Sequence, residues 1–208
     1  MHVKVCGVRT AEVAVAAVEA GADLIGVMLE PRSPRHASPA EVDAVVAAVR
    51  GRADVVAVMV SPTAERVAEV AARHAVAAVQ AHGDVRRSLA SASPVPVIRA
   101  VNPTSAAEAY TVDWWPDCLL LLDAPPRDLP GGTGTRVDLT VATEVARRRR
   151  ILLAGGLGPD TVAEAISVAR PDGVDASSGL ESAPGVKDTA LVVAYVRAAR
   201  AAAVEAGI

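Results

Sequence analysis

The sequence has few aromatic residues and few cysteines, and each shortage excludes a class of protein. Among 208 residues there is no Phe, and only two Trp and two Tyr occur. The hydrophobic residues, 51% of the chain, are mostly Ala and Val, which predicts an interior of small aliphatic side chains. Two cysteines are too few for a disulfide framework. We expect Cys6 and Cys118 to be unbridged, as is usual in a cytoplasmic protein.

The chain also lacks a long hydrophobic run, a strong net charge and a cofactor motif. No apolar run approaches the roughly 20 residues that span a bilayer, and the opening HVKVCGV predicts a strand rather than a signal peptide. A formal net charge of −3 and a pI near 5.8 disfavour nucleic acid and acidic membrane surfaces as partners. The four histidines have no metal-ligand spacing, no GxGxxG follows the first predicted strand, and there is no Walker loop. We therefore expect no metal, no dinucleotide and no ATP, and a small molecule as the partner.

Short apolar runs alternate with Ala-rich amphipathic segments along the whole chain. Strands are predicted at residues 2–7, 23–29, 54–60, 76–81, 95–101, 117–123, 150–154 and 173–177. Helices are predicted at residues 11–20, 39–50, 63–74, 84–92, 104–112, 138–148, 159–169 and 188–205. Strands that are apolar on both faces and alternate with helices form a parallel sheet. Eight even units predict one domain over residues 1–208, a (β/α)8 TIM barrel, with an open doubly wound sheet as the alternative fold.

Two segments near the C-terminus predict a phosphate site. LLAGGLGPD (residues 152–160) and DGVDASSGLE (residues 172–181) each predict a short strand that runs into small residues and then a helix. Backbone N–H groups of such turns bind anions, and TIM barrels bind phosphate after their seventh and eighth strands. Alternatively, the glycines only permit tight turns. The residues expected to bind phosphate are Gly155, Gly156, Ser177, Ser178 and Gly179.

Cys6 and Asp123 are the candidate catalytic residues, because each ends a predicted strand at the catalytic rim of the barrel. Asp123 follows the apolar run LLLL, where partial desolvation raises the pKa of a carboxyl group and suits it to donate a proton. A thiolate facing a carboxylic acid makes a general base and a general acid. The alternatives are inert packing for Cys6 and a capping or loop-bracing role for Asp123.

Four further residues are expected to bind the substrate or support the site. Arg35 offers a bidentate match to a carboxylate, although a lone loop arginine is usually solvated. Gln80 and His82 lie at the end of the fourth predicted strand, and for His82 we favour bracing of the loop over proton transfer. Gly132 lies in the loop PGGTG. Arg99 is a candidate only by its position near the end of the fifth predicted strand.

Several motifs together resemble one family over nearly the full length of the chain. They are KVCGV at 4–8, EAGADLIGVML at 19–29, PRSPRHASP at 31–39, VQAHGD at 79–84, LLLDA at 120–124, GGTG at 131–134, LAGGL at 153–157, and VDASSGLE with PGVKD at 174–188. In this order they resemble the phosphoribosylanthranilate isomerases of tryptophan biosynthesis. The resemblance implies a (β/α)8 barrel that performs an Amadori rearrangement of N-(5-phosphoribosyl)anthranilate to the 1-deoxyribulose phosphate, as a monomer or a homodimer.

The resemblance also implies a role for each site residue. Cys6 would be the general base that takes the C2 proton, and Asp123 the general acid that opens the furanose at its ring oxygen. Arg35 would hold the anthranilate carboxylate, and the residues around the two Gly/Ser turns would hold the phosphate. No cofactor is implied, since ring opening needs only an acid and enolisation only a base.

The sequence departs from the family pattern beside the expected ring pocket. Ala81 occupies a position where the family usually has Leu, and Met28, Leu29 and Glu30 occupy positions where it has aromatic residues. The segment 135–139 also lacks the usual Lys and aromatic-Asp-Trp run. We therefore expect a wider, less apolar ring pocket. Two alternatives stay open, a paralogue for another phosphoribosylated aryl amine and a non-catalytic phosphosugar-binding barrel. The second would need neither catalytic residue.

Overall fold

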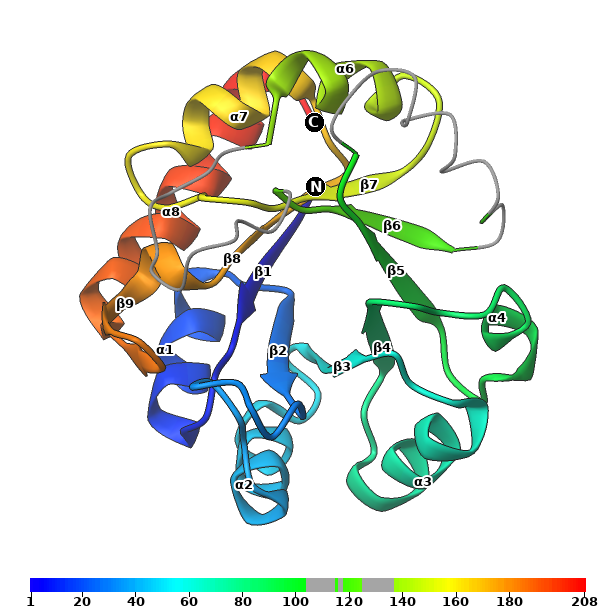
Figure 1. Cartoon of the computed structure of the whole chain (residues 1–208). Coiled ribbons are helices and arrows are strands. Elements are labelled where there is room, and N and C mark those ends of the chain that lie inside the picture. The colour runs from blue at the N-terminus through cyan, green and yellow to red at the C-terminus, as the bar shows by residue number, and fades with distance from the viewer. Residues whose placement is uncertain (104–114, 116–117, 125–136) are drawn as a thin grey trace.

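Eight parallel strands pair in chain order, and the first strand closes on the last to form a barrel with helices around it (Figure 1). The structure, a computed structural model, describes residues 1–103, 115, 118–124 and 137–208. The predicted single-domain (β/α)8 barrel is confirmed. Within the described ranges, no helix is long and apolar enough to cross a membrane.

The strands begin and end within a few residues of their predicted positions. They are β1 (His2–Cys6), β2 (Leu24–Met28), β3 (Asp54–Val60), β4 (Ala78–His82), β5 (Val97–Val101), β6 (Leu119–Leu122), β7 (Ile151–Leu153) and β8 (Gly173–Ala176). The helices are α1 (Ala11–Ala20), α2 (Pro39–Val49), α3 (Ala64–His74), α4 (Leu89–Ala92), α6 (Leu139–Ala146), α7 (Val162–Ala169) and α8 (Thr189–Ala206). The helix predicted at residues 104–112 lies outside the described residues.

The predicted helix 84–92 is wrong in its first half, because α4 begins only at Leu89. Gly83 has a left-handed φ of +74°, and the backbone N–H of Asp84 donates to Ser61 Oγ at 3.0 Å. This contact ties the chain to the loop after β3. Because this contact holds the chain at residue 84, the helix begins only further along the sequence.

An unpredicted hairpin separates β8 from α8. The 3-10 turn η2 (Ser178–Leu180) leads into β9 (Glu181–Ala183), which pairs antiparallel with β10 (Val186–Lys187). Asp188 then caps α8, and its carboxylate accepts from the backbone N–H groups of Ala190 and Leu191. The predicted helix at 188–205 therefore follows the second Gly/Ser turn as expected, but the 3-10 turn and the hairpin lie between the two.

The apolar side chains form two cores, as the alternation of side chains along buried strands requires. The larger core lies between the barrel and its helices, where Val3 and Val5 of β1 point outward. The smaller core fills the barrel interior and consists of Val56, Ile98, Ala100, Leu121, Leu152 and Ala154. On β1 and β8, the side chains that alternate with the outward-facing ones also point into the barrel. These inward-facing side chains include polar and charged groups.

Candidate active site

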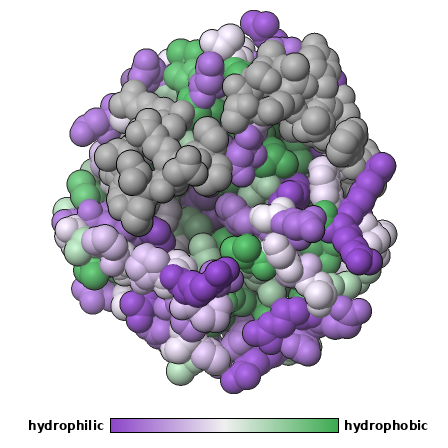
Figure 2. All heavy atoms as spheres, in the orientation of Figure 1, coloured by the Kyte–Doolittle hydropathy of each residue, from purple (hydrophilic) through white to green (hydrophobic). Residues whose placement is uncertain are grey.

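The carboxyl ends of the strands surround a cavity of about 240 Å³. Figure 2 shows a hollow near the centre of the surface, where hydrophilic and hydrophobic residues meet. The cavity brings together most of the predicted site residues, namely Cys6, Arg35, Gln80, His82, Asp123, Gly155, Gly156, Ser177 and Ser178. Gly179 is not among the residues that line it, and Gly132 lies outside the described residues.

Cys6 ends β1 and points into this cavity, with 6% of its surface exposed. Cys6 and Cys118 form no disulfide bond. Burial raises the pKa of the Cys6 thiol, and the nearby cations of Lys4 and Lys187 act in the opposite sense. A thiol of raised pKa is mostly protonated near neutral pH, and the two cations increase the fraction that is thiolate.

Asp123 follows β6 and lines the same cavity from another side. Its backbone N–H donates to Val101 O at 2.9 Å, which continues the β5–β6 ladder and fixes the residue at the rim. One carboxyl oxygen accepts from the backbone N–H of Ala124 at 2.8 Å. Burial raises the pKa of Asp123 to about 6. The carboxyl group therefore holds a proton more readily than an exposed aspartate and can donate it.

Arg35 is held by Glu181 of β9 in a two-point ion pair. Its Nε and Nη2 donate to the two oxygens of the Glu181 carboxylate at 2.7 and 2.8 Å. Lys187 Nζ also donates to Glu181 at 2.7 Å. Burial acts to raise the pKa of Glu181, but these two cations outweigh it and hold the pKa below its ordinary value. The alternative in which Arg35 is a solvated loop arginine is wrong, because the ion pair with Glu181 fixes the direction of its guanidinium group.

The two Gly/Ser turns lie against each other. Gly155 and Gly156 have φ of +81° and +69°, in the left-handed region that favours glycine. A side chain on Gly155 would lie 2.7 Å from the backbone nitrogen of Ala124. A side chain on Gly179 would overlap the Leu157 carbonyl. Gly179 therefore serves to bring the turn after β8 against the turn after β7.

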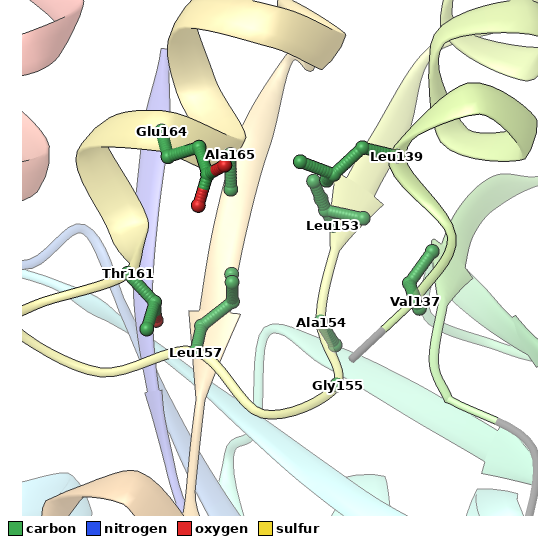
Figure 3. Close-up of a pocket in the computed structure, with 9 residues that line it drawn as sticks. All are labelled: Val137, Leu139, Leu153, Ala154, Gly155, Leu157, Thr161, Glu164 and Ala165. Carbon is green, nitrogen blue, oxygen red and sulfur yellow. The ribbon is translucent and has the colours of Figure 1, made fainter. Parts of the chain in front are cut away.

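Lys187 connects the second turn to the Arg35 ion pair. Its Nζ donates to the backbone oxygen of Ser177 at 3.0 Å and lies 3.3 Å from Ser177 Oγ. A second small cavity of about 10 Å³ lies behind the first turn, between α6 and α7 (Figure 3). Val137, Leu139 and Leu157 are among the side chains that line it, so apolar packing supports the turn from the rear.

His82 and Gln80 form a polar pair on β4. Gln80 Nε2 lies 2.7 Å from His82 Nε2, and a neutral imidazole accepts this hydrogen bond. Burial, together with the charges of Lys4 and Arg99, lowers the pKa of His82 to about 4. The Oε1 atom of Gln80 is buried and has no hydrogen-bond partner in the described part of the chain. It can therefore accept a hydrogen bond from a ligand in the cavity.

Three of the four altered positions before the sixth strand, on which the expectation of a wider ring pocket rests in part, do not line the cavity. Ala81 is fully buried in the outer core, and Leu29 packs against the same core. Glu30 pairs with Arg32. Of the four altered positions before the sixth strand, only Met28 lines the cavity. Alternation along β4 directs residue 81 away from the barrel interior, which a comparison of residue types could not reveal.

Arg99 is not part of the cavity. Its guanidinium donates to the backbone oxygens of Ala81 and Gly83 at 2.9 and 2.8 Å, and it lies 5.4 Å from the centre of the Trp115 ring. Arg99 therefore braces the end of β4 from outside. The part of the chain that the structure describes contains no cluster of three or more His, Cys, Asp or Glu residues that could hold a metal ion.

Sequence reasoning missed Lys4, Asp175, Glu181 and Lys187 as members of the site. Lys4 had a local signal, since it lies two residues before Cys6 and must share its face of the strand. Glu181 and Lys187 were visible only within the motifs VDASSGLE and PGVKD. Asp175 precedes the second turn by two residues, and its ion pair with Lys4 depends on the closure of the barrel.

Comparisons with known proteins agree on one family. Residues 3–198 match the family described as N-(5'phosphoribosyl)anthranilate (PRA) isomerase. An N-(5'-phosphoribosyl)anthranilate isomerase from a Roseiflexus species is 41% identical, over 98% of this chain and 99% of that protein. The isomerase from Geobacter metallireducens is 35% identical, over 97% of this chain and all of the relative.

Solved structures give the same result. The crystal structure of phosphoribosyl anthranilate isomerase from Thermotoga maritima has a TM-score of 0.89 and 31% identity, over 97% of this chain and 99% of that one. A structure of the isomerase in complex with reduced 1-(o-carboxyphenylamino)-1-deoxyribulose 5-phosphate has a TM-score of 0.86 and 30% identity, with the same coverage.

Proposed function

The chain belongs to the N-(5'-phosphoribosyl)anthranilate isomerase family, and on this premise we propose that Cys6 and Asp123 form the acid–base pair of its reaction. The protein is an isomerase of tryptophan biosynthesis that converts N-(5'-phosphoribosyl)anthranilate to 1-(o-carboxyphenylamino)-1-deoxyribulose 5-phosphate. One observation carries the assignment of the pair. The thiol and the carboxyl group line a single cavity, which the two Gly/Ser turns and Arg35 also line.

The reaction moves two protons, one at each catalytic group. Asp123 would donate its proton to the ring oxygen of the furanose, the bond from that oxygen to C1 breaks, and a protonated imine forms. Cys6 would then take the proton from C2, which gives a neutral enolamine that tautomerises to the ketone product. Both groups are held on the rigid rim of the barrel, so that a sugar fixed at its two ends would lie between them.

The substrate's two anionic ends suit two different parts of the cavity. The turns at Gly155–Gly156 and Ser177–Gly179 would hold the phosphate through backbone N–H groups. Arg35 would hold the anthranilate carboxylate. Its bonds to Glu181 use Nε and Nη2, so Nη1 remains for the substrate. The Glu181 pair thus orients the arginine before substrate arrives, and preorganisation of this kind strengthens binding.

The two pKa values predict the pH dependence of the reaction. The active form needs Asp123 protonated and Cys6 ionised, although burial gives the carboxyl a pKa of about 6 and raises the pKa of the thiol. In the form that prevails near neutral pH, the proton is on Cys6 and Asp123 is ionised. Because both forms hold equal numbers of protons, the active share is constant between the two pKa values. We expect kcat/KM, which reports the free enzyme, to fall below about pH 6 and to stay level above it, until the thiol ionises.

Turnover of freshly prepared phosphoribosylanthranilate, followed by the loss of its fluorescence, tests the pair. Cys6→Ser and Asp123→Asn should each lower kcat at least ~100-fold, the usual scale for a lost general acid or base. Cys118→Ser is the matched control for Cys6, because Cys118 is also buried but does not line the cavity. It should retain turnover. Near wild-type kcat in both catalytic variants would show that the assignment is wrong.

The substrate itself is tested by growth. The chain should restore growth without tryptophan in a host that lacks its own isomerase. Failure to grow despite expression, with turnover of another phosphoribosylated aryl amine, would favour the specialised paralogue. Failure on every such amine would favour the binding barrel. We place this biosynthetic enzyme in the cytoplasm, as a monomer or a homodimer that binds neither nucleic acid nor membrane.

A further inference from the structure

The buried ammonium group of Lys4 has no role in the acid–base scheme. Lys4 lies two residues before Cys6 on β1, so both side chains point into the barrel. Its side chain is wholly buried, and Nζ donates to Asp175 Oδ2 at 2.9 Å. Burial acts to lower the pKa of Lys4, but the charges and hydrogen bonds of Asp175 and Cys6 together outweigh it, and the pKa lies above the ordinary value. Lys4 is therefore a cation inside the barrel, and Asp175 keeps it charged.

Gly26 leaves the space that lets this cation approach the thiol. Gly26 pairs with Cys6 in the β1–β2 ladder. A side-chain carbon at Gly26 would lie 2.8 Å from Cys6 Sγ and 3.1 Å from Lys4 Nζ. Both atoms therefore border the same small space and lie within about 6 Å of each other. At this distance, inside a protein, an opposite charge changes the pKa of a neighbour by roughly 1–3 units.

The groups around the thiol do not all act in the same sense. The charged or titratable side chains that line its cavity or interact with Cys6 include Lys4, Arg35, His82, Asp123, Asp175, Lys187 and Tyr195. Lys4 is the main group that favours the thiolate, and Lys187 acts in the same sense from β10. Asp175 acts against the thiolate. Its nearer effect is on Lys4, to which it is directly bonded.

We propose that Lys4 is a positioning residue for catalysis, whose ammonium group stabilises the thiolate of Cys6 across the space left by Gly26, while Asp175 keeps Lys4 protonated. The proposal rests on the assignment of Cys6 as the base. The active form, with an ionised thiol and a protonated carboxyl group, is a small fraction of the enzyme. Any rise in the thiol pKa therefore lowers this fraction further. Lys4 therefore acts on kcat without touching the substrate.

The test measures the thiol and the reaction in the same proteins. In a Cys118→Ser background, Cys6 is the sole cysteine, and the ultraviolet absorbance of its thiolate is titrated against pH. The same titration of Cys6→Ser/Cys118→Ser subtracts the tyrosine signal. The variant is Lys4→Met/Asp175→Asn, which removes both charges so that neither is left buried alone. Far-UV circular dichroism checks that it folds, and Lys4→Gln/Asp175→Asn, which also removes both charges, replaces it if it does not.

We expect the thiol pKa to rise by at least one unit and kcat to fall at least ~10-fold, with KM within about threefold of the parent. Lys187→Met is the matched control, since Lys187 also bonds Ser177 and Glu181. The main effect of Lys187→Met should be a higher KM. Its shift of the thiol pKa should be smaller than that of Lys4→Met/Asp175→Asn. An unchanged thiol pKa, or a raised pKa with unchanged kcat, would overturn the role of Lys4. Full turnover by Cys6→Ser would instead refute the base assignment itself.

Discussion

The barrel interior has two unlike walls, and each carries one of the two proposed catalytic groups. The charged wall, from β1 and β8, contains Lys4, Cys6 and Asp175, with a buried ion pair at its centre. The apolar wall, from β5, β6 and β7, contains Ile98, Ala100, Leu121, Leu152 and Ala154, and Asp123 lies at its upper end. Both proposed catalytic groups are therefore buried, but in different surroundings. The thiol lies beside a cation, and the carboxyl group lies beside aliphatic side chains.

The difference between the walls shows how one cavity can hold an acid and a base. Desolvation opposes charge on both groups. On the apolar wall, the interactions that favour the charged carboxylate are too weak to offset desolvation. The pKa of Asp123 therefore rises to about 6, which suits a proton donor. On the charged wall Lys4 offsets part of the desolvation, which suits a proton acceptor. An Asp→Asn change should therefore have opposite effects on stability in the two walls.

The largest expected effect is on the charged wall. Asp175→Asn leaves the Lys4 ammonium buried without its partner, and removal of one member of a buried pair costs about 3–5 kcal/mol. Urea unfolding followed by circular dichroism measures the loss. Asp160→Asn, at an exposed position, is the control and should change stability by less than about 0.5 kcal/mol. Equal stability of Asp175→Asn and the parent would mean that Lys4 carries no charge in the folded protein.

A smaller effect of the opposite sign is expected on the apolar wall. The folded pKa of Asp123, about 6, exceeds its ordinary value of 3.8. The folded state therefore binds the proton more tightly, and the free energy of unfolding falls as pH rises from about 4 to 6. Above pH 6 the penalty is complete. Asp123→Asn should then gain about 1–2 kcal/mol at pH 8, after allowance for partial exposure.

Thermal unfolding at two pH values checks this gain. At pH 8 the melting temperature of Asp123→Asn should exceed that of the parent by roughly 2–8 °C. Near pH 3, below both pKa values, the two proteins should melt at the same temperature, because the carboxyl group is then protonated in the folded and the unfolded state. A destabilised variant at pH 8 would show that the hydrogen bond from Ala124 outweighs desolvation.

The smallest expected effect is on His82, which lies between the walls on β4. Burial and the Lys4 charge lower the pKa of His82 to about 4. Its imidazole NMR signals should therefore stay constant from pH 8 to about pH 5 and shift only below that. In Lys4→Met/Asp175→Asn the shift should begin at higher pH, since one of the opposing cations is gone. A wild-type titration near pH 6.5 would contradict the described surroundings of His82.

The chain order of elements and the positions of the catalytic pair follow from local patterns. Apolar strands that alternate with helices form a parallel sheet, and when eight such units close into a barrel, the carboxyl ends of all strands lie at one rim. Cys6 and Asp123 were therefore recognisable as rim residues from their place at strand ends. The length of α4 was not, because the contact between Asp84 and Ser61 that delays it joins two separate loops.

The surroundings that tune this pair were decided by the tertiary structure. Lys4 and Asp175 are 171 residues apart in the chain, and Arg35 and Glu181 are 146 apart. Each pair meets only because β1 closes on β8 and the β9–β10 hairpin folds back toward the loop after β2. Side-chain alternation is a local property with a period of two, so the sequence determined which residues face inward. Which charges then become neighbours depends on ring closure and register, and these set the pKa values on which the chemistry rests.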